Sequence, residues 1–287
     1  MRIDTFTGKE KKLLFWEDSD DSIKVKEYMI QNKLTGIVFS RYFGFEKSEV
    51  TIHAPFEFVD EVHVLESNME NISFIYNFPN AKTLNIQNED KTKIDFGRFE
   101  DLEDLFIYWQ KGMANLSDRK KLKILCLHGF KEKIFDISPQ TPLEELRLYK
   151  SPVENLSSLG ALKTLKSLMF FDLRCLEDIT WLQGLENLET IYFQRCRKIK
   201  NWDMISRLPN LKVICLDRCG TINDINFLKP LENLERVVLA GDTKLISGAV
   251  RWLYEKPKIT YIGLPWRKDF DITLEESQAG EGWRKGH

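Results

Sequence analysis

Cysteine and histidine are the residues of this sequence that could hold a metal ion or act as nucleophiles. The five cysteines are an odd number and lack the CxxC spacing of metal sites. None of the four histidines has ligand spacing to a second histidine or cysteine, so the sequence predicts no metal site. These residues are Cys126, Cys175, Cys196, Cys215, Cys219, His53, His63, His128 and His287.

Sequence motifs of catalysis and phosphate binding are also missing. The chain contains no GxxxxGK[ST], GxGxxG, HExxH or GxSxG segment. Acidic pairs such as Glu144-Glu145 and Glu275-Glu276 are simply explained as solvated charge. We therefore expect a protein that is not an enzyme and that needs no cofactor.

The composition narrows the class of partner and the compartment. The net charge is −2, with 30% charged residues, whereas nucleic-acid-binding proteins usually carry a clear basic excess. The apolar stretch Leu13 to Trp16 is too short for a signal-peptide core, and no stretch approaches the roughly 18 apolar residues of a membrane span. Together with free thiols, this predicts a cytoplasmic protein with no membrane contact, for which nucleic acid is an unlikely partner.

The elements that position the side chains follow from an internal repeat. From Leu211 to Asn233 the sequence has the skeleton LxxLxLxxCxxIxxIxxLxxLxN, and earlier copies begin at Leu188, Leu165 and Leu143. The second apolar position of each copy serves as its anchor, and anchors from Leu105 to Val237 follow at steps of 20 to 23 residues. The full series of anchors is Ile37, Val62, Leu84, Leu105, Leu125, Leu146, Leu168, Ile191, Ile214, Val237 and Ile262.

This skeleton resembles the leucine-rich repeat, whose period is about 20–29 residues. The dipeptides Asp178-Ile179 and Asp224-Ile225 and the asparagines before the next leucine are similar to the short internalin-type and phosphatase-regulator-type subclasses. The resemblance covers about residues 34 to 266. One turn position, usually asparagine in the family, departs from the pattern, so these turns need other hydrogen-bond partners. It holds Gln110, Phe130, Ser151, Leu173, Cys196, Cys219 and Asp242.

The equivalent positions of Cys196 and Cys219 in adjacent repeats favour buried small side chains over a disulfide or a metal pair. The resemblance implies an α/β solenoid, a right-handed horseshoe or arc with a parallel concave sheet. The convex segments, with apolar residues at i, i+3 and i+6, predict short α or 3₁₀ turns.

The ends of such an array need covers, because an end repeat exposes the core. We expect residues 1–33 to form an N-terminal cap with a helix from Ser22 to Leu34, for which Ser22 is the possible cap residue. Residues 34–266 then form about 10–11 rungs, with a longer helix from Gly248 to Glu255 before the last strand. Residues 267–287 are predicted to be a polar, flexible tail.

The residues that alternate with the core leucines face the concave surface, which we expect to be open because a solenoid has no second layer there. In the middle rungs they form an aromatic sheet with basic edges. Exposed apolar patches mark partner sites, and Tyr, Trp and Arg dominate interface hot spots. The predicted partner-binding residues are Phe106, Tyr108, Trp109, His128, Arg147, Tyr149, Met169, Phe171, Tyr192, Arg195 and Arg218.

The sequence thus predicts a non-enzymatic module, favoured as a monomer, that binds a protein partner in a regulatory, adaptor or immunity-type inhibitor role. RNA or nucleotide binding is one alternative, with bases stacked on the aromatic rings and phosphates bound by Arg147, Arg195 and Arg218. The other alternative is a scaffold that self-associates through the same stripe.

Overall fold

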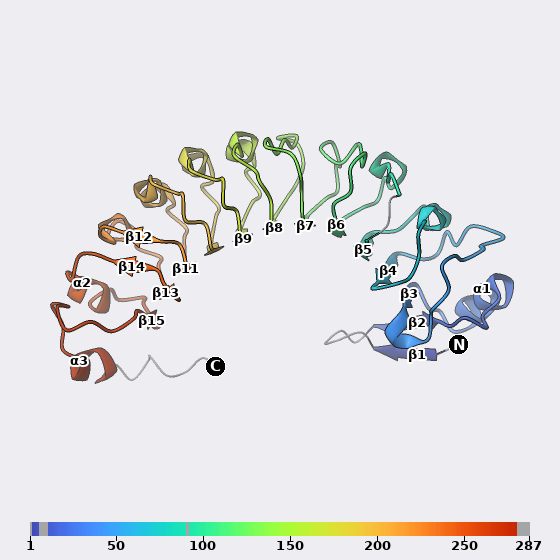
Figure 1. The fold of residues 1–287 in the computed structure, drawn as a ribbon, viewed down its shortest axis with the longest axis horizontal. Coiled ribbons are helices and arrows are strands. Elements are labelled where there is room, and N and C mark those ends of the chain that lie inside the picture. The colour runs from blue at the N-terminus through green and yellow to red at the C-terminus, as the bar shows by residue number, and fades with distance from the viewer. Residues whose placement is uncertain (1, 6–10, 90–91, 280–287) are drawn as a thin grey trace. The chain divides into compact units, whose positions relative to one another are not determined.

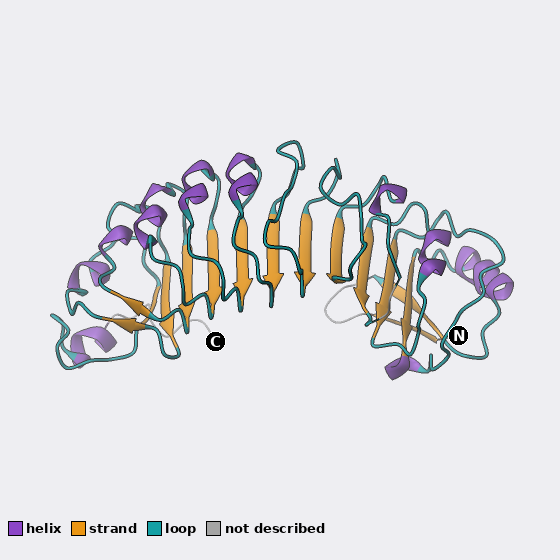
Figure 2. Cartoon of the chain, turned by 45° about the horizontal axis from the view of Figure 1, so that its top comes forward, coloured by secondary structure: helices purple, strands orange, loops and turns teal. Residues whose placement is uncertain are grey.

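The computed structural model describes residues 2–5, 11–89 and 92–279. The chain forms two compact units, Met1–His128 and Gly129–His287. In each unit, parallel strands line the inner side and most of the short helical turns lie on the outer side (Figures 1 and 2). This arrangement confirms the predicted α/β solenoid.

The sheet of the first unit has the order β1-β2-β3-β4-β5-β6-β7. Only β1 and β2 are antiparallel, and each later pair is parallel. The elements are β1 (Arg2–Thr5), β2 (Lys12–Trp16), α1 (Ser22–Gln31), β3 (Gly36–Ser40), η1 (Arg41–Phe43), β4 (Glu61–Leu65), η2 (Ser73–Asn77), β5 (Thr83–Gln87), η3 (Phe96–Arg98), β6 (Asp104–Tyr108) and β7 (Ile124–His128), where η denotes a 3₁₀ turn.

The second unit continues the same plan with the strand order β8-β9-β10-β11-β13-β15. A separate two-stranded sheet joins β12 and β14. The elements are β8 (Glu145–Tyr149), η4 (Ser157–Ala161), β9 (Ser167–Phe171), η5 (Thr180–Gly184), β10 (Thr190–Gln194), η6 (Trp202–Arg207), β11 (Val213–Asp217), β12 (Thr221–Ile222), η7 (Asn226–Leu228), β13 (Arg236–Ala240), β14 (Lys244–Leu245), α2 (Arg251–Tyr254), β15 (Tyr261–Gly263) and α3 (Leu274–Ala279).

The register of the strands confirms the repeat anchors. Ile37 pairs with Val62, and Leu168 pairs with Ile191, as do the anchors of the other parallel pairs described within each unit. The anchors of β3 to β11 and β13 are almost completely buried, because period-two alternation points them into the coil. The intervening positions are therefore left on the inner face of the sheet.

Two polar devices fix the spacing between rungs of the second unit. The amide nitrogens of Asn187, Asn210 and Asn233 donate to backbone carbonyls of the preceding rung at 2.8 to 2.9 Å. The residue after each of β8 to β11 has a positive φ, and its N–H donates to the carbonyl of the last strand residue of the next rung, as from Arg195 to the Asp217 carbonyl at 2.8 Å. The residues with positive φ in these turns thus place charged side chains at one edge of the sheet.

The N-terminal rungs differ from the expected open inner face. Leu13, Phe15 and Val38 belong to this face, but they are buried in a second apolar cluster packed by Phe43 and Leu65. The prediction that a solenoid has no second layer is therefore wrong for β2 and β3. The reason is that η1 follows β3 directly and brings Phe43 to 4.6 Å from Phe15, ring centre to ring centre.

Both ends carry helical covers that differ in detail from the expectation. Helix α1 is capped by Asp21 rather than by Ser22, since the Asp21 carboxylate accepts the N–H groups of Ile23 and Lys24. Helix α2 is a single turn, shorter than the predicted helix.

Within the segment predicted to be a flexible tail, α3 spans Leu274–Ala279, Phe270 and Ile272 are buried, and the Asp271 carboxylate accepts the N–H groups of Val250 and Arg251. The remainder of that predicted tail, residues 280–287, lies outside the described residues.

Candidate functional site

The inner face of the second unit carries a stack of aromatic rings. Tyr149 and Phe171 are paired across β8 and β9, and their rings lie 4.3 Å apart and within 2° of parallel. The ring of Tyr192, on β10, lies 5.2 Å from that of Phe171 at 32°. We call these three side chains the aromatic ladder. All three are half-buried, so the stacked rings present their edges to solvent.

A second row of side chains lies two residues earlier on each strand, and Tyr192 belongs both to this row and to the aromatic ladder. Arg147, Met169, Tyr192 and Cys215 are aligned across β8 to β11. The Arg147 guanidinium is held by the Glu145 carboxylate at 2.5 Å, so it is oriented along its own strand. Met169 is half-buried, which leaves a polarisable side chain next to the rings.

The turns that follow the ladder strands are rich in basic residues. A hollow of about 480 Å³, lined by Asp172, Arg174, Arg195, Arg197 and Lys198, lies between the turns after β9 and β10. We call it the basic hollow. Arg174 bonds Asp172 at 2.8 and 3.1 Å, and this guanidinium holds the pKa of the Asp172 carboxyl below its usual range. Arg195 is exposed and has no ion pair with the described residues.

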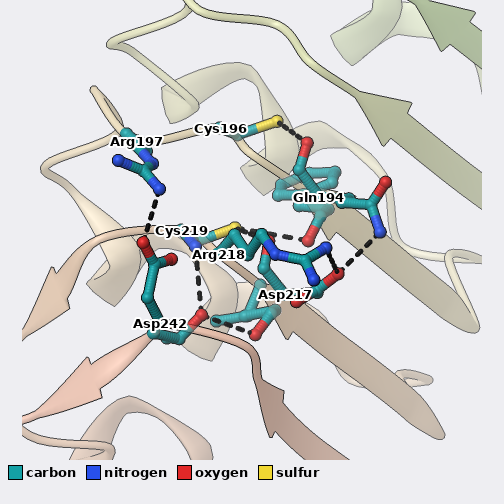
Figure 3. Close-up of polar contacts among 10 residues, drawn as sticks. Gln194, Cys196, Arg197, Asp217, Arg218, Cys219 and Asp242 are labelled. Atoms are coloured by element: carbon teal, nitrogen blue, oxygen red, sulfur yellow. Dashed lines mark hydrogen bonds and ion pairs between the residues drawn. The ribbon is translucent and has the colours of Figure 1, made fainter.

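Arg218 lies in the turn after β11 (Figure 3). Its guanidinium contacts the neighbouring Asp217 carboxylate at 3.2 Å, and the same carboxylate accepts the amide of Gln194 at 2.6 Å. Asp217 is buried, so it anchors Arg218 and Gln194 rather than offering a free negative charge. The predicted basic edge is thus partly neutralised at Arg218, but not at Arg195.

The first unit contains the other predicted contact residues. Tyr108 and His128 are paired across β6 and β7 with ring centres 4.6 Å apart, and Phe106 lies in the row beside them. Trp109 follows β6 and donates its backbone N–H to the His128 carbonyl at 2.8 Å. All four are half-buried. This set is smaller than the one in the second unit.

The turns behind the ladder are held by buried thiols and a hydroxyl, not by asparagine. The Cys219 thiol donates to the Phe193 carbonyl at 3.2 Å, and the Cys196 thiol lies 3.9 Å from the Phe170 carbonyl (Figure 3). In the next rung Thr243 occupies the turn position equivalent to Cys196 and Cys219, and its hydroxyl donates to the Leu216 carbonyl at 2.9 Å. The assignment of this position to Asp242 is therefore wrong, because that turn contains one more residue; Asp242 is exposed and pairs with Arg197.

The three buried cysteines are poorly suited to nucleophilic chemistry. None of the five cysteines forms a disulfide, and Cys196, Cys215 and Cys219 are buried. Burial raises the pKa of Cys219 to about 12 and that of Cys215 to about 11, and it raises the pKa of Cys196 further. These thiols are protonated at neutral pH and poorly nucleophilic. The burial predicted for Cys196 and Cys219 agrees with these positions.

Residues 2–5, 11–89 and 92–279 contain neither a candidate metal site nor a membrane-spanning helix. Within those ranges no three His, Cys, Asp or Glu side chains are grouped so that they could hold a metal ion. The helices in the same ranges are all too short or too polar to cross a membrane.

Sequence reasoning missed Arg174, Arg197 and Lys198. Their signal was available in the turns after β9 and β10, which read DLRC and RCRK, where basic residues alternate with the buried ones. The repeat anchors specify strand positions, so they do not point to basic residues in these turns. The structure adds them to the surface around Arg195.

Comparison with protein-family models gives no match, and no curated protein matches the chain. Solved structures do match. The functional domain of InlJ from Listeria monocytogenes, which includes a cysteine ladder, gives a TM-score of 0.51 at 17% identity, and the match covers 82% of this chain and 59% of that chain.

Two further structures are similar at lower scores. The internalin InlF from Listeria monocytogenes gives a TM-score of 0.47 at 15% identity, covering 74% of this chain and 76% of that chain. A leucine-rich-repeat protein of Leptospira interrogans gives 0.33 at 14% identity, covering 86% and 87%.

Parallel strands in register, one for each repeat of about 20 to 25 residues, define a leucine-rich-repeat solenoid. The chain has this solenoid fold, which is similar to that of an internalin domain. The likeness concerns the fold, so the function has to be argued from the surface described above.

Proposed function

We propose that this chain is a non-enzymatic protein-interaction module whose partner docks on the aromatic ladder of the second unit. The observation that carries the proposal is the stack of Tyr149, Phe171 and Tyr192, three half-exposed rings on the inner face of the sheet. Rigid aromatic side chains already held in place lose little conformational freedom on binding, which is why they anchor interfaces. The role is regulatory, adaptor or inhibitory.

The other predicted contact residues form two groups, one in each unit. Arg147, Met169, Arg195 and Arg218 surround the ladder in the second unit, and Phe106, Tyr108, Trp109 and His128 form a separate contact set in the first. The absence of disulfides among the five cysteines supports the expected cytoplasmic location.

RNA binding receives less support from the same geometry. A base stacks on an open ring face, but Phe171 has Tyr149 against one side and Tyr192 close by, so the ladder offers edges rather than faces.

The experiment is affinity capture from native lysate with three purified forms: wild type, Phe171→Asp, and Ala161→Asp as the matched control. Ala161 is exposed on η4, on the opposite side from the strands. We expect wild type and Ala161→Asp to retain the same proteins and Phe171→Asp to lose them, with all three showing the same circular dichroism spectrum. Retention of the same proteins by a folded Phe171→Asp would refute the proposal.

A further inference from the structure

The charges beside the aromatic ladder indicate what kind of protein segment it fits. Each ladder strand ends in a left-handed residue whose side chain leaves the same edge of the sheet: Lys150 after β8, Asp172 after β9 and Arg195 after β10. Asp172 is engaged by Arg174, whereas Lys150 and Arg195 are exposed and form no ion pair with the described residues. Two uncompensated positive charges therefore flank Phe171.

The basic hollow adds to this excess. Four of its five lining side chains are cationic. The single carboxylate, that of Asp172, accepts hydrogen bonds from the Nε and Nη2 atoms of Arg174. Arg197 is turned toward Asp242, and Lys198 lies 3.6 Å from Glu177. Of the four cations that line the hollow, Arg195 is the one that forms no ion pair with the described residues.

The opposite edge of the same sheet shows that this imbalance is local. There the charges form ion pairs between neighbouring rungs, Lys166 with Glu144 at 2.7 Å and Lys212 with Glu189 at 2.9 Å. Because the charges of each pair cancel, this edge offers little net charge for a partner to bind. The uncompensated charge lies on the edge that Lys150 and Arg195 occupy.

We infer that the ladder and the basic edge together bind an acidic segment of a partner protein that contains aromatic or large apolar residues. The apolar side chains contact the ring edges of Tyr149, Phe171 and Tyr192, and the carboxylates of the segment pair with Lys150 and Arg195. The partially positive ring edges favour the same negative groups. This inference rests on the proposed protein-binding function and specifies the chemistry of the partner.

The test is fluorescence polarisation with four labelled probes. One is a short peptide in which phenylalanines are set among glutamates; the second has lysine for each glutamate; the third has alanine for each phenylalanine; the fourth is single-stranded RNA. We expect the first peptide to bind at least about tenfold more tightly than the others, and more weakly as salt rises. Equal or tighter binding of the lysine peptide or of RNA would overturn the inference.

Variants locate the contact. Arg195→Glu should lower the affinity for the acidic peptide by about fivefold or more, since an attraction becomes a repulsion. Lys150→Glu should do the same. Arg207→Glu is the matched control, because Arg207 is exposed on η6 on the other side of the rung, and it should stay within about twofold of wild type. Equal effects of Arg195→Glu and Arg207→Glu would show that only the overall charge matters and would contradict the proposed site.

The two proposals fail in different ways. If Phe171→Asp abolishes capture of a cellular protein but the acidic peptide has no advantage, the face binds proteins by other chemistry and the present inference alone is wrong. If wild type self-associates and the acidic peptide does not compete, a second copy of the chain is the occupant, and the inference is likewise wrong.

Discussion

Thr243 and Cys219 are joined by a hydrogen bond that ties two turns of the solenoid together. The Cys219 N–H donates to the Thr243 hydroxyl at 3.0 Å, and that hydroxyl donates to the Leu216 carbonyl at 2.9 Å. Thr243 is buried, so no water replaces it. A single hydroxyl therefore satisfies one backbone donor and one backbone acceptor.

Replacing Thr243 by valine removes that hydroxyl at nearly constant volume. The buried donor and acceptor lose their partner, and we expect the free energy of unfolding to fall by about 1–3 kcal/mol. Thr243→Ser, which keeps the hydroxyl, should recover most of this loss. Urea denaturation of the three proteins measures it.

The neighbouring residue provides the control for that measurement. Asp242 makes an exposed ion pair with Arg197, and Asp242→Ala should cost at most about 1 kcal/mol. A larger effect of Asp242→Ala than of Thr243→Val would restore Asp242 as the structural residue of this turn.

This pair of residues also shows where sequence reasoning ends. The anchors predicted the strand register, because a residue one place out would be turned from core to solvent. A turn has no such alternation. The turn after Ala240 contains one extra residue, so the buried position is occupied by Thr243 and not by Asp242, which the repeat pattern does not reveal. The burial of the N-terminal inner face was also hidden, since Phe43 covers it from outside the repeat pattern.

The candidate site was predictable in composition but not in geometry. Period two placed Tyr149, Phe171 and Tyr192 on one face, and the structure has them there. Which arginines are engaged depended on side-chain contacts, such as Arg147 with Glu145, that spacing does not specify.

Gly184 is expected to tolerate no side chain. A Cβ added there would lie 2.1 Å from the backbone oxygen of Gly160 in the preceding rung, because η4 and η5 pack closely. Gly184→Ala should lower the free energy of unfolding by about 1–3 kcal/mol through forced separation of the two turns. The adjacent exposed Gln183→Ala should stay within about 0.5 kcal/mol in the same urea titration. Similar midpoints for the two variants would show that the turns separate freely.

The thiols should fall into two reactivity classes. Cys126 and Cys175 are partly exposed, whereas Cys196, Cys215 and Cys219 are buried with raised pKa values. With Ellman's reagent at neutral pH, we expect two thiols to react in the native protein and all five only after denaturation. Rapid reaction of Cys196 or Cys219, identified by peptide mapping, would contradict their burial.

Stability should also decline at alkaline pH for the same reason. The Cys219 pKa rises from its ordinary 9.0 to about 12 on folding, so the protonated thiol stabilises the folded state fully below pH 9. As pH rises above 9, the unfolded state releases the proton first and this stabilisation is lost. Between about pH 8 and pH 10, Cys219→Ser should lose less stability than wild type, by on the order of 1 kcal/mol. Parallel losses in the two proteins would show that the thiol does not titrate in this way.

The central claim is that a protein partner sits on the aromatic ladder, and cross-linking from the ladder itself tests it most directly. A benzophenone amino acid replaces Phe171 in one form of the protein and Ala161 on the outer side in another, and each is irradiated in native lysate. We predict a discrete adduct with another protein from position 171, none from position 161, and loss of the adduct when excess unlabelled wild type, but not Phe171→Asp, is added. Adducts from position 161 alone, or from 171 undiminished by wild type, would contradict the account.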